Sequence, residues 1–135
     1  MTAEGAIFDL LTANAGVDAI AGDRISPHNR LQGSELPAVV YAVESFEPVR
    51  VLAGTADLTM ATVSIAAIAE TYAQAKTLAA VTIAALNGVS GEHDGTNIFS
   101  LVYFGQTAAD AGIGEGEEDL PFEIITEFRM HYEGL

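Results

Sequence analysis

The sequence predicts an α+β fold, an antiparallel sheet of about four strands with two helices packed on one face. Segments with the two-residue alternation of a strand and segments with the spacing of an amphipathic helix follow one another in the order α-β-β-α-β-β. Strands adjacent in sequence favour antiparallel pairing, with the helices segregated to one face. The length of 135 residues fits one domain, residues 1–135.

The first element predicted is an amphipathic helix over residues 2–13, with its first residue as the cap. After a short interruption, residues 17–21 add one further turn. Residues 22–37 contain two Pro, two Gly and several polar residues, which is typical of a loop. This loop also holds Arg24 and Arg30, two of only five basic residues in the chain.

Two strands and a helix are predicted next. The Val, Tyr and Phe content of residues 38–46 indicates a strand whose extension Pro48 limits. Residues 58–69 alternate, and their more apolar set is expected to face the core: Thr59, Ala61, Val63, Ile65 and Ala67. Thr71 then caps a helix over residues 72–86 that stops at Asn87 and Gly88. Its predicted buried stripe consists mostly of small residues, suited to close packing on a sheet: Ala75, Leu78, Ala79, Thr82, Ala85 and Leu86.

The C-terminal third predicts two further strands. Asp94 and Gly95 offer a tight turn before a strand over residues 97–104, and residues 106–120 form an acidic, glycine-rich loop. The last strand, residues 121–132, alternates strictly. Its predicted core face is Phe122, Ile124, Thr126, Phe128, Met130 and Tyr132. Glu123, Ile125, Glu127, Arg129 and His131 occupy the other face.

The charge balance limits the partners. Nineteen Asp and Glu stand against five Lys and Arg, a formal charge of −14, which repels nucleic-acid phosphates and anionic membranes. The chain has no cysteine, so disulfides and thiolate chemistry are excluded. The longest uncharged run, residues 77–91, is too short to span a bilayer, and the acidic start predicts no secretory signal. We therefore expect a soluble protein made in the cytosol, without membrane contact.

No metal or cofactor site is expected. The three histidines, His28, His93 and His131, lie in separate segments without ligand spacing. The carboxylates of Glu115, Glu117, Glu118 and Asp119 lack the alternating spacing of a calcium loop. A solvated acidic loop is the simpler interpretation.

No enzyme is expected either. Glu123 and Glu127 lie four residues apart beside Arg129, and a charged outer face that blocks stray strand pairing explains them better than paired-carboxylate catalysis. The stretch GVSG follows a helix and lacks the strand that a nucleophile elbow requires. The stretch GIGEG at residues 112–116 is not expected to be a phosphate-binding loop. It opens no helix, and the acids that follow would repel phosphate.

Four stretches together carry a family resemblance: LLTANAGVDAIAGDRISPHN, SELPAVVYAVES, AETYAQAKTLAAVTIAALNG and FEIITEFRMHYE. In this order and spacing they resemble the tail-completion family of tailed bacteriophages and prophages, also called tail terminator or tail-to-head joining proteins. The resemblance covers nearly the whole chain. The acidic stretch 109–120 is a departure that the family pattern does not prescribe.

The resemblance implies a structural role without catalytic residues. Such proteins form a ring, usually a hexamer, that ends growth of the tail tube and meets the head-side connector. The implied partners are further copies of the chain, the tail tube protein, the connector or stopper protein, and DNA that passes through without specific binding. The implied location is the tail or neck of a virion assembled in the bacterial cytoplasm. Two alternatives remain: a head-closure or neck protein of the same particle, and a small α+β ligand-binding domain.

Within a ring, two groups of residues are site candidates. The acids Asp110, Glu115, Glu117, Glu118, Asp119 and Glu123 are expected to face the lumen or a ring surface, where they let DNA slide past. Arg24 and Arg30 are expected to pair with acids of a neighbouring subunit or of the tube. The alternative is that both neutralise local carboxylates such as Asp23 and Glu35.

Overall fold

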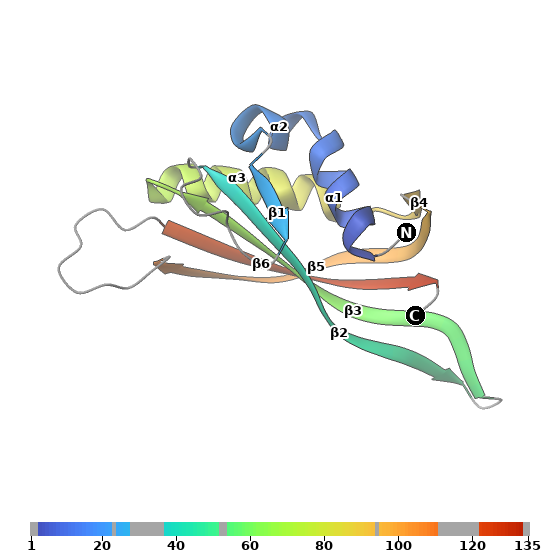
Figure 1. The fold of residues 1–135 in the computed structure, drawn as a ribbon. Coiled ribbons are helices and arrows are strands. Elements are labelled where there is room, and N and C mark those ends of the chain that lie inside the picture. The colour runs from blue at the N-terminus through green and yellow to red at the C-terminus, as the bar shows by residue number, and fades with distance from the viewer. Residues whose placement is uncertain are drawn as a thin grey trace.

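The computed structural model of the chain describes residues 3–22, 24–27, 37–51, 54–93, 95–110 and 122–133. The fold is α+β, with one sheet in the order β1-β2-β3-β6-β5-β4 and helices on one of its faces (Figure 1). The helices are α1 (Ala3–Ala13), α2 (Ala15–Ala21) and α3 (Tyr72–Leu86). The strands are β1 (Ile25–Pro27), β2 (Ala38–Val51), β3 (Gly54–Ala69), β4 (Gly91–His93), β5 (Thr96–Asp110) and β6 (Phe122–Glu133).

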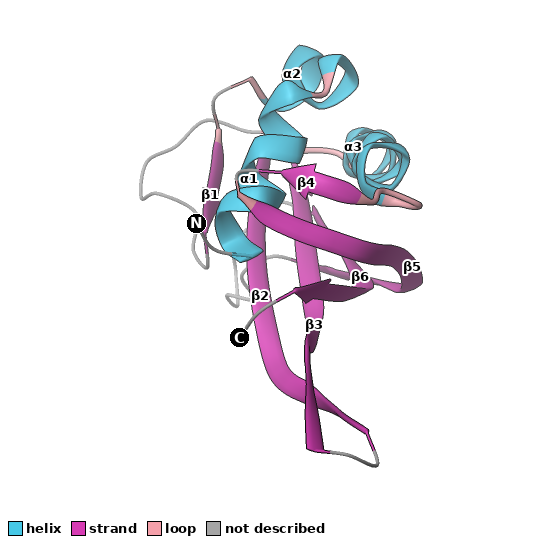
Figure 2. Cartoon of the chain, turned by 90° about the vertical axis from the view of Figure 1, so that its right-hand side faces the viewer, coloured by secondary structure: helices cyan, strands magenta, loops and turns pink. Residues whose placement is uncertain are grey.

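All three helices lie on the same face of a curled sheet, as the view along the sheet edge shows (Figure 2). Helix α3 packs on β3 and β6, and α1 and α2 pack against α3. The core lies between the two layers and includes the fully buried side chains of Ile7, Leu11, Ile65, Leu78 and Phe128. The prediction of helices on one face is confirmed.

The alternation predicted for the two central strands is confirmed. In β3, the core set Thr59, Ala61, Val63, Ile65 and Ala67 is buried. In β6, burial alternates from residue to residue from Ile124 on, and the predicted core face is buried except for Phe122, which is half-buried. Both strands lie inside the sheet, and α3 packs on their core faces.

Helix α3 has the predicted bounds and caps. The hydroxyl of Thr71 accepts the backbone N–H of Gln74 at 3.1 Å, which satisfies one of the donors free at a helix N-terminus. At the other end, the N–H of Asn87 donates to the carbonyl of Ile83 at 2.8 Å. The predicted stripe is buried except for Ala85, which is half-buried against the core. Its small residues let the helix lie close to β3 and β6.

The prediction of two helices is wrong, because the N-terminal segment forms two. Asn14 leaves the helical conformation, with φ −83° and ψ 123°, and its side-chain oxygen accepts the N–H of Val17 at 3.0 Å. Asn14 thereby caps a new helix, α2, where the sequence indicated only a further turn. The predicted cap at Thr2 lies outside the described residues.

The prediction of about four antiparallel strands is also wrong. Strand β1 pairs with β2 in parallel, so the sheet is mixed, and β4 forms a hairpin with β5. Gly95 takes φ +77° in that hairpin, as the predicted turn requires. Each additional strand has only three residues, too few to show a periodicity, and β1 lies in a segment with a loop-like composition.

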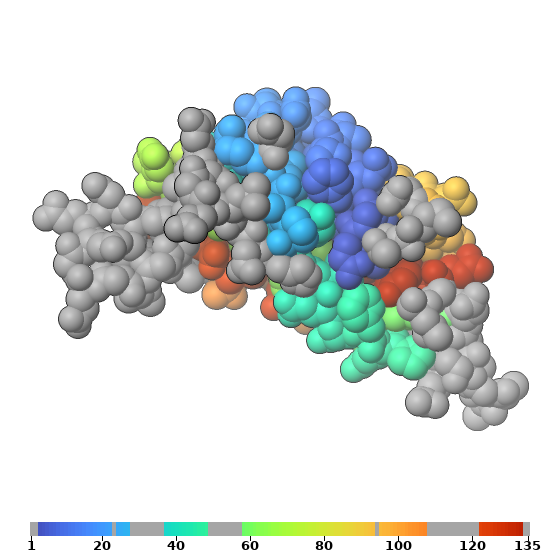
Figure 3. Space-filling view, viewed as in Figure 1, coloured from blue at the N-terminus to red at the C-terminus, as the bar shows by residue number. Residues whose placement is uncertain are grey.

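Three strands are longer than predicted. Strand β2 continues through Pro48 to Val51, and β3 begins at Gly54, so their hairpin extends past the helical layer (Figures 1 and 2). Pro48 is tolerated because β2 pairs with β1 only at residues 39–41 and is an edge strand beyond them. The first five residues of the predicted acidic loop, 106–110, are strand and belong to β5. In the space-filling view, β2 (teal) remains at the surface below α1 (Figure 3).

Candidate interaction surface

The sheet face opposite the helices carries side chains in rows that cross several strands. The pairing register aligns Glu44 of β2, Thr62 of β3, Arg129 of β6 and Val102 of β5 in one such row. None of the described helices packs on this face (Figure 2). An antiparallel sheet commonly leaves one face to water, but such a face is then polar. Here part of it is apolar.

The apolar part lies on β5. Phe99, Val102 and Phe104 are 53%, 50% and 61% exposed, which is high for large apolar side chains. Two register shifts, between Ile98 and Ser100 and between Tyr103 and Gly105, change which residues face the core. We call Phe99, Val102, Phe104 and the adjacent Arg129 the β5 surface.

Arg129 belongs to this surface through an aromatic contact. Its guanidinium lies 4.2 Å from the centre of the Phe104 ring, and its register partner on β5 is Val102. A guanidinium over an aromatic face is attracted by the negative charge of the ring centre. Among the described side chains, the recorded contact of Arg129 is therefore with a ring and not with a carboxylate. Among the described residues, its charge therefore has no carboxylate partner.

The backbone edge of β5 is partly occupied. The N–H of Gly88 donates to the carbonyl of Leu101 at 2.7 Å, and the N–H of Tyr103 donates to the Asn87 side-chain oxygen at 2.9 Å. The segment after α3 therefore takes up two edge groups that another strand would need for pairing. A partner that meets β5 here must do so through side chains.

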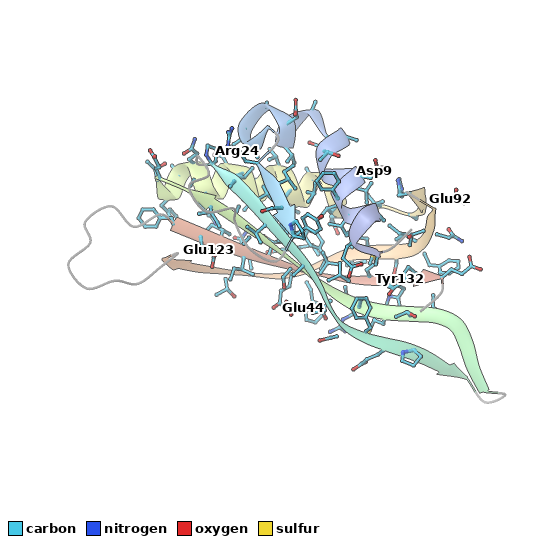
Figure 4. The ribbon with its side chains drawn as sticks, in the orientation of Figure 1. Asp9, Arg24, Glu44, Glu92, Glu123 and Tyr132 are labelled. Atoms are coloured by element: carbon cyan, nitrogen blue, oxygen red, sulfur yellow. The ribbon has the colours of Figure 1, made fainter. Side chains whose placement is uncertain are left out.

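A second exposed feature lies on β2, in the opposite half of the sheet from β5, with β3 and β6 between them. A register shift between Glu44 and Glu47 marks a β-bulge, and Ser45 has φ +55°, the only positive φ among the described non-glycine residues. Residues 44–48 are all exposed, and Phe46 retains 49% of its accessible area. We call residues 44–48 the bulge surface. Figure 4 shows Glu44 on the side of the sheet away from the helices.

The predicted acidic site is only partly within the described residues. Glu123 lies near the start of β6, half-buried, between Ile68 of β3 and Ala109 of β5. The backbone of Asp110 pairs with Phe122 at the end of β5. The side chain of Asp110 is outside the described part of the chain, as are Glu115, Glu117, Glu118 and Asp119. The lumen hypothesis for these acids stays a prediction.

The described acids do not converge on a site. Figure 4 places Glu123, Glu44 and Glu92 at well-separated points along the sheet. The described residues contain no group of three or more His, Cys, Asp or Glu side chains able to hold a metal ion. Because β6 is an interior strand between β3 and β5, Glu127 and Arg129 do not protect a sheet edge. The interpretation of their charges as a guard against strand pairing is wrong.

Arg24 serves the chain's own fold. Its Nε donates to the carbonyl of Pro37 at 2.8 Å, and its Nη2 donates to the carbonyl of Ile20 at 3.1 Å. The side chain thus connects the C-terminal end of α2 to the start of β2 (Figure 4), where a cation also complements the helix dipole. Arg30 and the acids proposed to neutralise both arginines, Asp23 and Glu35, lie outside the described residues. Pairing of Arg24 and Arg30 with another subunit stays a prediction.

Two buried tyrosines have altered acidity. Burial raises the pKa of Tyr41 and Tyr132, and the nearby negative charge of Glu4 raises both further. Tyr41 also packs against the Phe8 ring, with ring centres 6.0 Å apart. Both tyrosines belong to the buried core, and their hydroxyls favour the neutral form.

Comparison with known proteins identifies the family. The sequence profile described as "Tail completion protein gp17" matches residues 5–133. The chain belongs to this family. Membership confirms the resemblance found in the sequence and makes the chain a structural tail protein of phage-like virions.

The fold of this tail completion protein also occurs in a solved structure, titled "Virion of native gene transfer agent (GTA) particle". The two chains superpose with a TM-score of 0.80 at 20% identity, over 98% of this chain and 95% of the other. At this identity the likeness shows the fold. No curated protein matches the sequence.

Sequence reasoning missed both exposed surfaces of the tail completion protein. The run NIFSLVYF is apolar at nearly every position, so it has no period that separates buried from exposed residues. Such a run is equally typical of a strand that is covered on both faces, so it does not show which side chains are exposed. The bulge in β2 leaves no sequence signal beyond Pro48.

Proposed function

We propose that this tail completion protein acts as a single-domain subunit, residues 1–135, of a hexameric ring that ends the tail tube and joins it to the head-side connector. The observation that carries the proposal is the family match over residues 5–133. The likeness of fold over 98% of the chain to a chain from a virion supports it. A purely structural role, without catalytic residues, is part of the proposal.

The acidic composition suits a channel for DNA. Six copies, each with a formal charge of −14, carry −84. Affinity for DNA depends on cations that neutralise its phosphates, so a bore lined by carboxylates lets DNA pass without holding it. We assign this lining to the acids between Gln106 and Glu123. A ring reconstruction with these acids on the outer circumference and a neutral bore would reject the assignment.

Deletion of the gene tests the role itself. A terminator is required to stop tube growth and to join the tail, so electron micrographs of lysates should show free heads beside unjoined tails of irregular length. Purified protein added to the lysate should restore joining. If the tails instead keep a uniform length and the heads lose their DNA, the protein closes the head and the terminator proposal fails.

The ligand-binding alternative makes a different prediction. A small α+β binding domain would remain monomeric at all concentrations and bind a metabolite, whereas a ring subunit requires no ligand to associate. Light scattering over a concentration series, repeated with assembled particles as a reference, distinguishes the two. A monomer that binds a metabolite and is absent from particles would overturn the proposed function.

A further inference from the structure

We propose that neighbouring subunits join head to tail through the two exposed surfaces: the bulge surface of one copy docks on the β5 surface of the next. This inference rests on the proposed ring and names its subunit contact. It commits to a second copy of this chain as the occupant of the β5 surface.

The β5 surface has the composition of a protein interface. Aromatic side chains and arginine are enriched at interface centres, where they contribute most of the binding free energy. Phe99, Val102 and Phe104 expose half or more of their area within six residues of one strand. These side chains are exposed and therefore do not contribute to the core. An exposed apolar cluster on a chain with a formal charge of −14 is typical of an interaction site.

The charge of Arg129 indicates which partner fits the β5 surface. The described side chains include three with a fixed positive charge. Arg24 donates to two backbone carbonyls, and Lys76 donates to the Gln106 side-chain oxygen at 2.8 Å. Arg129 contacts an aromatic ring instead. Its complement is an apolar group with carboxylates beside it, which is what Glu44, Phe46 and Glu47 present on the bulge surface.

Both surfaces cannot meet within one copy. Strands β3 and β6 separate β2 from β5, and Thr62 lies between Glu44 and Arg129 in their common row. Because the two surfaces differ and lie in opposite halves of the sheet, contact between copies is head to tail. Repetition of such a contact closes a ring when the rotation fits.

The backbone supports contact through side chains. Asn87 and Gly88 occupy the edge groups of Tyr103 and Leu101, which opposes addition of a strand at that point. On the other side, the left-handed conformation of Ser45 is unfavourable for a residue with a side chain. Bulges re-aim side chains, and this one leaves Phe46 outward between two acids.

Engineered cysteines test the contact directly, because the chain has none of its own. The double variant Phe46→Cys, Phe104→Cys is assembled into particles by complementation of the gene deletion and then oxidised. Head-to-tail contact should give a ladder of disulfide-linked oligomers that ends at the ring size. Each single variant should stay monomeric under denaturing conditions. Asp9→Cys combined with Phe104→Cys is the matched control, since Asp9 is exposed on the helical face, and it should give no ladder.

Two results would overturn the proposal. One is cross-linking by Phe104→Cys alone, which indicates two β5 surfaces face to face. The other is particles that contain the double variant but yield no ladder. If the wild-type protein is absent from particles, the proposed function itself is rejected. That result differs from the two above, which reject only the contact between subunits.

A charge exchange provides a second readout. Arg129→Glu should reduce assembly into particles at least tenfold, and Glu47→Lys in the same chain should restore most of it. Glu92→Lys, a matched change at an exposed position on β4, should not restore it. Equal rescue by both lysines would show a general effect of net charge and would count against the contact.

Discussion

A buried hydroxyl without a partner provides the sharpest test of the core. Thr126 lies at the centre of β6, fully buried, in register with Ile65 of β3 and Gln106 of β5. Its Oγ1 has no hydrogen-bond partner among the residues that the structure describes. Since burial removes the hydroxyl from water without replacing its hydrogen bonds, the folded state carries the desolvation penalty of that group, about 1–3 kcal/mol.

Thr126→Val should therefore raise the free energy of unfolding by about 1–2 kcal/mol, because a methyl of similar shape replaces the hydroxyl and valine is equally suited to a strand. An unfolding entropy of about 2.1 cal/mol/K per residue corresponds to about 0.28 kcal/mol/K for this chain, so Tm should rise by about 3–7 °C. Urea denaturation followed by circular dichroism, together with a thermal melt, measures both quantities.

Thr82→Val is the matched control. Thr82 is also fully buried, but its hydroxyl donates to the carbonyl of Ala79 at 2.7 Å. The same substitution there removes a satisfied hydrogen bond and should lower stability by about 1 kcal/mol. If Thr126→Val does not stabilise, or if both variants gain equally, the orphaned hydroxyl is not the cause and the reasoning fails.

Four further substitutions test other parts of the fold. Thr71→Ala removes the cap of α3 and should lower the free energy of unfolding by about 1 kcal/mol. Thr77→Ala, inside the same helix, should raise it by a few tenths of a kcal/mol, because alanine has the higher helix propensity. Equal effects of the two substitutions in urea melts would reject the capping role. Arg24→Met removes two hydrogen bonds to carbonyls and should cost about 1–2 kcal/mol in the isolated protein, while an unchanged stability would leave the side chain available for an interface. Because the pKa of Tyr132 is raised, the folded state keeps its proton longer than the unfolded chain does, so stability should fall as pH rises above about 10. Glu4→Gln should lower that pKa slightly, since burial is the larger cause, and absorbance titration of the phenol measures the change; an increase would contradict the contribution of Glu4.

The correct predictions share a physical basis. Helix α3 and the core faces of β3 and β6 were predicted residue by residue because each element is long and buries one face, so a period of 3.6 or 2 is imposed on the sequence. Asn14 was visible as an interruption, but its effect depends on whether α2 finds a surface to pack on. That surface is α3, which lies far along the chain.

The charges show the same division. The sequence established a large negative charge and the scarcity of cations. It did not indicate that Arg24 would bind carbonyls of its own chain or that Arg129 would lie on Phe104, because both contacts join segments brought together by the fold. The interior position of β6 likewise reversed the meaning assigned to its charged face.

By itself, the sequence determined the fold class, the bounds of α3, the buried faces of the central strands and the family, all of which are written in local periodicity and in ordered motifs. Only the tertiary structure decided the strand order, the parallel pairing of β1 and the exposure of the β5 and bulge surfaces. The physical reason is that a register shift of one residue exchanges the two faces of a strand, and the shift is set by the neighbouring strand and not by the strand's own residues.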